Sequence, residues 1–521
     1  MKKILISSLA LTGLLFTVSC NTDFDTDVKD VKVTSGTADF TRYVSLGNSL
    51  TSGYRDGALY LDGQNESYPS MIAAQMKLAG GASVFNQPLM SDNLGGFSNL
   101  FNATTGDFGG KYELKLVDVK DANGNVIGKE LKPVQSIPAT PLGNITSGGP
   151  YQNLGVPGAK SFHLLYNGYG NIANLATKTA NPYFVRFASS PTATVVGDAL
   201  AQNPTFFSLW IGNNDTLGYA TSGGDATLDQ ITPATNFSAY YSTIVNTMVS
   251  KGAKGVVANL PYVTSIPFFT TVPYNPLTSS VLGKGNVALG EKTIDDLNAG
   301  LYSPLNQILT ALGAGDRIKP LSKNSGNPLL ITDETLPDLS AQIKAVAGTI
   351  PSLAPLAAYL GATYGKARQA KSTDYVLLST QSAIGVSVTL PAGVPSTLAA
   401  NGISYPFADR YILLQSEATE INSAIDSYNA TIKSIADSKG LAFVDANTKM
   451  KELSQNSGIQ FDGVKYTAKF VTGGAFSLDG VHLTGRGYAI IANEFIKAIN
   501  GKYGSTLPNV NPNSYSGVKF P

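Results

Sequence analysis

Stretches with the apolar pattern of strands alternate with stretches that have the pattern of helices along most of this chain. The strand-like runs lie at residues 40–50, 204–212, 255–263 and 441–446, and the helix-like runs at 67–79, 236–252, 416–440 and 485–499. This alternation favours a parallel sheet covered by helices on both faces, because parallel strands need long crossover connections. The sequence therefore predicts an α/β protein.

Two segments interrupt the alternation and are interpreted as insertions. Residues 87–148 are rich in Gly, Asn, Asp, Pro and Thr, and the pair Asn123-Gly124 within them is a hairpin signal. Residues 266–408 hold Pro-rich turns with few periodic stretches. We expect a small β-excursion in the first segment and a lid or subdomain in the second, for which an independent binding domain is the alternative. Both would interrupt a single domain of residues 39–521.

The amino terminus has the layout of a secretory signal. Lys2 and Lys3 precede an apolar run, and small residues precede Cys20, the only cysteine of the chain. The ending TVSC resembles a bacterial lipobox, which implies that residues 1–19 are a signal peptide and that Cys20 is lipidated. A lipid anchor explains why the one thiol of the chain lies at this position.

Residues 20–38 follow the anchor as a polar, acidic stretch without helical periodicity, and we expect them to form a flexible tether. Acidic residues just after the cysteine resemble the surface-export signal of lipoproteins in Bacteroidetes-type bacteria. We therefore expect an outer-membrane lipoprotein that is held to the membrane by its lipid and exposed at the cell surface. The periplasmic face is the alternative.

Charge and cysteine content exclude several partners. Lys and Arg number 37 against 36 Asp and Glu, so the chain has no basic field for a phosphate backbone, and we expect no nucleic-acid partner. A single cysteine excludes a disulfide framework and a thiolate metal cluster. The sequence also lacks a metalloprotease helix and a dinucleotide fingerprint. We expect neither a metal nor a cofactor.

Polar residues follow or precede probable elements at four places, in LGNSLTSGY around Ser49 and at residues 153–158, 211–215 and 477–487. The carboxyl ends of parallel strands share one edge of a sheet, so these stretches can meet there. A serine nucleophile needs a base, a group that orients the base, and donors for the oxyanion.

The chain has only two histidines, which restricts the choice of base. His482 has Asp479 three residues before it, a spacing that puts a carboxylate beside the imidazole. His163 has no acidic neighbour and lies in an apolar run, so we interpret it as structural. For the oxyanion, Gly155 allows close backbone approach, Asn214 offers a side-chain amide, and the Ser49 N–H is a third donor.

These stretches, in this order, resemble the four blocks of the GDSL, or SGNH, family of serine esterases and lipases. The resemblance implies Ser49 as nucleophile, His482 as base, Asp479 as its orienting group, and Gly155 with Asn214 as oxyanion donors. It also implies an SGNH-hydrolase fold, a flavodoxin-like three-layer sandwich with about five parallel strands. One departure is Asn48, which stands where the signature of the family has Asp.

The predicted function is that of a serine hydrolase that cleaves carboxylic esters through an acyl-enzyme. An acyl lipid and an acetylated glycan are both open as substrates, so a carbohydrate acetylesterase is one alternative. We expect the two insertions to select the substrate. A second alternative is a non-catalytic surface lipoprotein that keeps the fold as a glycan-binding module; the presence of all the site residues argues against it.

Overall fold

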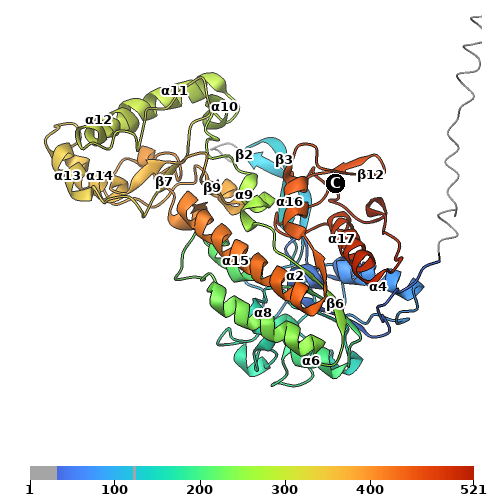
Figure 1. The fold of residues 1–521 in the computed structure, drawn as a ribbon. Helices are drawn as coiled ribbons and strands as arrows, with labels where there is room; N and C mark the ends of the chain where they lie inside the picture. The colour runs from blue at the N-terminus through green and yellow to red at the C-terminus, as the bar shows by residue number, and fades with distance from the viewer. Residues whose placement is uncertain (1–31, 121–124) are drawn as a thin grey trace, which may run out of the picture.

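The computed structural model describes residues 32–120 and 125–521 and has a five-stranded parallel sheet at its centre (Figure 1). The strand order is β11-β6-β5-β1-β4, and every neighbouring pair is parallel. The strands are β1 (Tyr43–Gly47), β4 (Asn153–Gly155), β5 (Phe206–Trp210), β6 (Lys254–Ala258) and β11 (Ala442–Val444). The predicted α/β class with about five parallel strands is confirmed.

Helices cover both faces of the sheet, and the side chains of β5 show why. Phe206 and Trp210 point to one face, where they pack against Tyr503 and Phe495. Phe207 and Leu209 point to the opposite face, so the strand is buried throughout and its residues are apolar except for Ser208. The covering helices are α4 (Tyr68–Leu78) and α17 (Gly485–Tyr503) on the first face, and α6 (Val195–Ala201), α8 (Ala234–Val249) and α15 (Gln415–Lys439) on the second.

The longest covering helices begin and end where local chemistry requires it. Thr484 caps α17 by accepting the Gly487 N–H at 3.1 Å, and the helix ends at Gly504 in the left-handed conformation with φ +65°. The helix α15 also ends at a left-handed glycine, Gly440. Such ends fix the helix lengths and therefore which residues reach the sheet edge.

The segment 87–148 contains one antiparallel hairpin, formed by β2 (Tyr112–Lys120) and β3 (Val126–Gln135). The predicted Asn-Gly turn between these strands lies outside the described residues. The hairpin is not free of the central domain, because the Tyr112 N–H donates to Asp56 O at 2.6 Å.

The segment 266–408 forms a lobe that projects from the sheet, at the upper left of Figure 1. It has a hydrophobic cluster of its own, which includes Tyr302, Ile343 and Tyr364. Its α-helices are α9 (Pro267–Thr270), α10 (Ser279–Leu282), α11 (Val287–Leu297), α12 (Ser303–Ala311), α13 (Ser340–Gly348) and α14 (Ala357–Tyr364). The stretch 336–350 has a helix-like sequence and corresponds to α13, whereas the sequence did not predict the other helices, of which α10 has only four residues.

The described chain begins at residue 32, so the predicted signal peptide and Cys20 lie outside the described residues. The predicted tether of residues 20–38 extends too far along the chain. Thr34 and Thr37 donate their N–H groups to Thr506 Oγ1 and Tyr503 O, both at 2.8 Å, and Ala38 is buried. The tether must therefore end before Thr34. Within the part of the chain that the structure describes, no helix has the length and apolarity needed to cross a membrane.

Candidate active site

Ser49 is the first residue of α2 (Ser49–Ser52), which begins two residues after β1 ends. Asn48 caps this helix, since its Oδ1 accepts the Leu50 N–H at 3.0 Å, and its Nδ2 donates to Asn213 Oδ1 at 3.3 Å. Gly47 leaves no room for a Cβ between Thr51 and the Trp210 carbonyl. This tight connection places the Ser49 hydroxyl at the carboxyl edge of the sheet. Asn48 thus makes the side-chain to backbone bond that a turn requires at this position.

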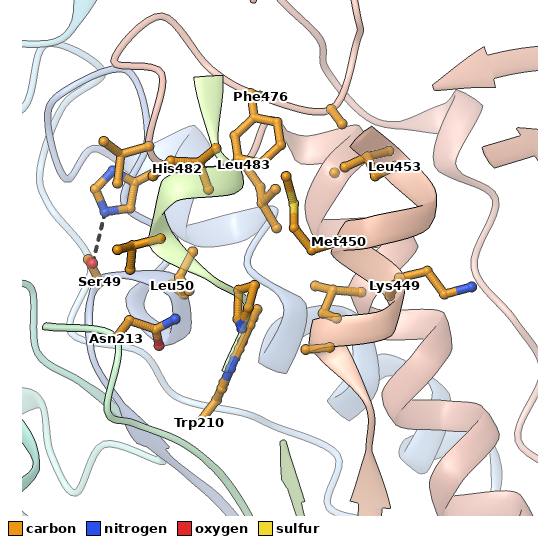
Figure 2. Close-up of a pocket in the computed structure, with 18 of the residues that line it drawn as sticks. Ser49, Leu50, Trp210, Asn213, Lys449, Met450, Leu453, Phe476, His482 and Leu483 are labelled. Carbon is orange, nitrogen blue, oxygen red and sulfur yellow. Dashed lines mark hydrogen bonds between the residues drawn. The ribbon is translucent and has the colours of Figure 1, made fainter. Parts of the chain in front are cut away.

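The structure brings Ser49, His482 and Asp479 together from opposite ends of the chain. His482 Nε2 lies 2.8 Å from Ser49 Oγ, and His482 Nδ1 lies 2.9 Å from Asp479 Oδ2 (Figure 2). In the tautomer with the proton on Nδ1, the ring donates to Asp479 and leaves Nε2 free to accept the serine proton. This is the geometry of an activated nucleophile with an oriented base.

Asp479 accepts hydrogen bonds at both oxygens. Oδ1 accepts from the N–H groups of Val481 and His482, both at 2.8 Å, and from the Ser477 hydroxyl at 3.1 Å. Oδ2 accepts from the Gly57 N–H at 2.9 Å in addition to the His482 ring. Burial alone would raise the pKa of Asp479, but the His482 ring and these donors hold the pKa well below its usual range. Asp479 is therefore a fixed carboxylate.

The second insertion bonds directly to the turn that carries Asp479, and the first insertion reaches this turn through Asp56. The hairpin of the first insertion binds Asp56 through Tyr112, and the Asp56 N–H in turn donates to Ser477 Oγ at 2.9 Å. At the start of the second insertion, the Phe268 N–H donates to Gly480 O at 2.9 Å. The insertions thus support the position of the carboxylate, a role that the sequence did not suggest.

The prediction that the Gly155 N–H donates to the oxyanion is wrong. Its N–H already donates to Asn153 Oδ1 at 3.0 Å, and the glycine packs directly against Ser52 in α2. Gly158, three residues further along, is exposed with φ +80°, and its N–H has no acceptor among the described residues. The Ser49 N–H likewise has no acceptor among them. The Pro157-Gly158 pair, a turn signal directly after a strand, could have pointed to this glycine.

Asn214 lies beside the same turn as Gly158. Its Nδ2 donates one hydrogen to Ala159 O at 2.9 Å, and the second hydrogen has no acceptor among the described residues. Asn213, which the sequence did not single out, lies next to Ser49 in Figure 2 and holds Asn48 through its Oδ1. Both amides line the cavity beside Ser49.

His163 lies apart from this cavity, in the 3-10 turn Ser161–Leu165. Its Nδ1 accepts the Lys160 N–H at 3.0 Å, and its ring stacks on Tyr169 with the ring centroids 4.4 Å apart. Burial, with a smaller effect of the Lys160 charge, lowers the pKa of His163 to about 4. A neutral, stacked ring that accepts a backbone N–H fits a structural histidine.

An apolar cavity of about 90 Å³ opens beside Ser49 and His482. Its walls come from the carboxyl ends of the central strands, from α16 (Ala446–Ser454) and from α17 (Figure 2). Of the two insertions, only Ile266 lines it. Nowhere in residues 32–120 and 125–521 do three His, Cys, Asp or Glu side chains gather as metal ligands.

The fold and this site together define an α/β protein that holds a serine, a histidine and an aspartate in hydrogen-bonded sequence at the carboxyl edge of a parallel sheet. Residues 368–495 match the model of a family described as GDSL-like Lipase/Acylhydrolase. This part of the chain is therefore a GDSL-like domain, and the resemblance to the GDSL, or SGNH, family is confirmed. The matched segment contains Asp479 and His482. Ser49 lies outside it and is brought next to His482 by the folding of the chain. A comparison with curated proteins finds no match to the chain.

Proposed function

We propose that this protein hydrolyses carboxylic esters through an acyl-enzyme formed on Ser49. The observation that carries the proposal is the unbroken contact from Ser49 Oγ through the His482 ring to Asp479, with distances of 2.8 and 2.9 Å. A serine held in a turn for structural reasons alone does not need an imidazole at its hydroxyl and a carboxylate behind that imidazole.

In the first step Ser49 Oγ attacks the ester carbonyl carbon while His482 Nε2 takes the hydroxyl proton. Asp479 stabilises the imidazolium that results and keeps the ring in position. When the tetrahedral intermediate collapses, the bond to the alcohol oxygen breaks and His482 gives its proton to the departing alcohol. Water then attacks the acyl-Ser49 ester with His482 again as base, which releases the acid and restores the serine.

Three donors are proposed for the oxyanion. They are the N–H groups of Ser49 and Gly158 and the second hydrogen of the Asn214 amide. All three lack an acceptor among the described residues, so each could donate to the substrate without breaking a bond that the protein already makes. Gly158 takes the place that the sequence had given to Gly155.

The test is hydrolysis of p-nitrophenyl esters by the soluble chain from residue 21, beside Ser49→Ala and His482→Ala. We expect each variant to lose about 10³-fold or more in kcat. His163→Asn is the matched control, because it removes the only other histidine and should keep the wild-type rate. Equal background rates for wild type and both site variants would refute the proposal and leave the non-catalytic binding module in its place.

We also propose that the mature protein is lipidated on Cys20 and held at the outer membrane, with its domain at the cell surface. The proposal rests on the signal layout and on the single cysteine of the chain. Labelled palmitate should be incorporated by the wild type and not by Cys20→Ala, and protease treatment of intact cells should remove the domain. Equal labelling of the two chains would contradict the lipid anchor, and full protection would place the domain on the periplasmic face.

A further inference from the structure

The cavity beside Ser49 has one polar end and otherwise apolar walls. The polar end is formed by Ser49, His482 and the neighbouring amides, while the walls away from it are built by apolar side chains (Figure 2). The principal wall residues are Leu50, Trp210, Met450, Leu453, Ile490 and Ile491. A ligand in this cavity therefore presents one polar group to Ser49 and apolar groups everywhere else.

Two walls carry a polar group, and neither group is available to a ligand. Trp210 Nε1–H donates to Asn259 O at 3.1 Å. Lys449 contributes its alkyl stem, while its Nζ is paired with Glu452 at 2.7 Å and with Glu494 at 3.0 Å. A sugar placed here would lose the hydrogen bonds of its hydroxyl groups to water and find no replacement, at a cost of about 1–3 kcal/mol for each group. An alkyl chain has no such loss.

We propose that this cavity binds the acyl chain of the ester substrate and that the preferred chain has about six carbons. This inference rests on the proposed function, because it takes Ser49 as the nucleophile. The acyl group stays bonded to Ser49 through both chemical steps, whereas the alcohol must leave before water can attack. A buried apolar cavity beside Ser49 therefore suits the acyl group rather than the alcohol.

The chain length follows from the cavity volume. A group the size of a water molecule or a methylene needs roughly 15 Å³ of cavity volume. The cavity of about 90 Å³ therefore accommodates a row of about six such groups. Each methylene group transferred from water into apolar surroundings should raise kcat/KM roughly fourfold. A hexanoyl group has four more methylene groups than an acetyl group, so kcat/KM should rise by up to about 250-fold from acetyl to hexanoyl esters and stop rising for longer chains.

The kinetic test compares kcat/KM for p-nitrophenyl acetate, butyrate, hexanoate and decanoate. Met450→Trp should fill the cavity between α16 and the sheet, so that the ratio of kcat/KM for hexanoate to that for acetate falls to about one. Lys451→Trp is the matched control, since it adds the same bulk on the exposed side of the same helix and should keep the wild-type profile. A chain-length profile that is flat for the wild type would overturn the inference, as would equal loss of acetate and hexanoate turnover in a folded Met450→Trp.

A binding test separates this inference from the proposed function. Trp210 is the only tryptophan of the chain and lines the cavity, so its emission reports what enters. With Ser49→Ala, sodium hexanoate should shift the emission in a saturable way, and sodium acetate should not. The same saturable shift in a protein that turns over no ester would support the acyl cavity and refute the esterase. Ester turnover with no emission change by hexanoate would leave the esterase standing and overturn the acyl cavity.

Discussion

Replacing Asp479 by Asn is the most informative single change in this site, because the two oxygens of the carboxylate have different donors. Oδ1 faces three donors, the N–H groups of Val481 and His482 and the hydroxyl of Ser477. Oδ2 faces the His482 ring and the Gly57 N–H. An asparagine keeps most bonds when its oxygen takes the Oδ1 place, so its NH₂ group must take the place of Oδ2.

That orientation changes the tautomer of the base. The new NH₂ group donates to His482 Nδ1, so the ring proton moves to Nε2. With the proton on Nε2, this nitrogen can no longer accept the proton of Ser49. We expect kcat to fall by about 10⁴-fold, or about 5.4 kcal/mol of barrier. The Gly57 N–H loses its acceptor as well, which should lower the free energy of unfolding by about 1–3 kcal/mol.

Two measurements check this reasoning. Ester hydrolysis gives the rate, and the nitrogen NMR spectrum gives the tautomer, which is simple to assign because the chain has only two histidines. The His482 signals should change from the Nδ1–H to the Nε2–H pattern while those of His163 stay as they are. Asp198→Asn, a change of the same kind at a half-buried carboxylate that binds Ser189, should keep the rate. A rate within tenfold of wild type, or an unchanged His482 tautomer, would refute the argument.

Two further predictions concern the carboxylates and amides around the sheet edge. Asn48→Asp should keep the cap on Leu50 and raise the esterase rate by less than tenfold, because the bond it removes, to Asn213 Oδ1 at 3.3 Å, is long and neutral; a larger gain in kcat would show that the natural asparagine is a handicap. Burial, together with Glu334 and other nearby carboxylates, raises the pKa of Asp409 to about 7. Between about pH 4 and 7 the Asp409 carboxyl is therefore ionised in the unfolded chain and neutral in the folded one, so the free energy of unfolding falls as the pH rises. Asp409→Asn should therefore raise the unfolding free energy at pH 8 by at most about 4 kcal/mol and change it little at pH 4, as thermal unfolding at the two pH values would show; equal effects at both would exclude this cause.

Much of the fold could be predicted because the central strands are buried on both faces. Four of the five residues from Phe206 to Trp210 are apolar for that reason, and the helices on either side of this strand keep a regular apolar period. The lobe formed by residues 266–408 was harder to predict. Its helices are short and pack on one another, so each of them offers only a few turns of apolar period from which to recognise it.

In the site, Ser49 with its N–H, His482 and Asp479 could be proposed from the sequence, whereas the glycine that offers a second backbone N–H could not. Asp479 and His482 are three residues apart, and the chain offers few other histidines. The choice between Gly155 and Gly158 depends on where Asn153 Oδ1 lies, because that oxygen takes up the Gly155 N–H. The cavity could not be predicted from the sequence either, because it forms only where α16 and α17 pack beside the sheet.

The path of the chain into β1 has a consequence for the orientation of the whole molecule. Lys32 and Thr37 are bound to Thr506 and Lys254 at the edge where the strands begin, and Ser49 opens at the edge where they end. The length of β1, roughly 16 Å, separates the two edges. In a chain tethered through Cys20, the tether would join the domain at the edge opposite the one where Ser49 opens. Such an enzyme would meet esters that arrive from the surroundings of the cell more readily than the lipids of the membrane that holds it.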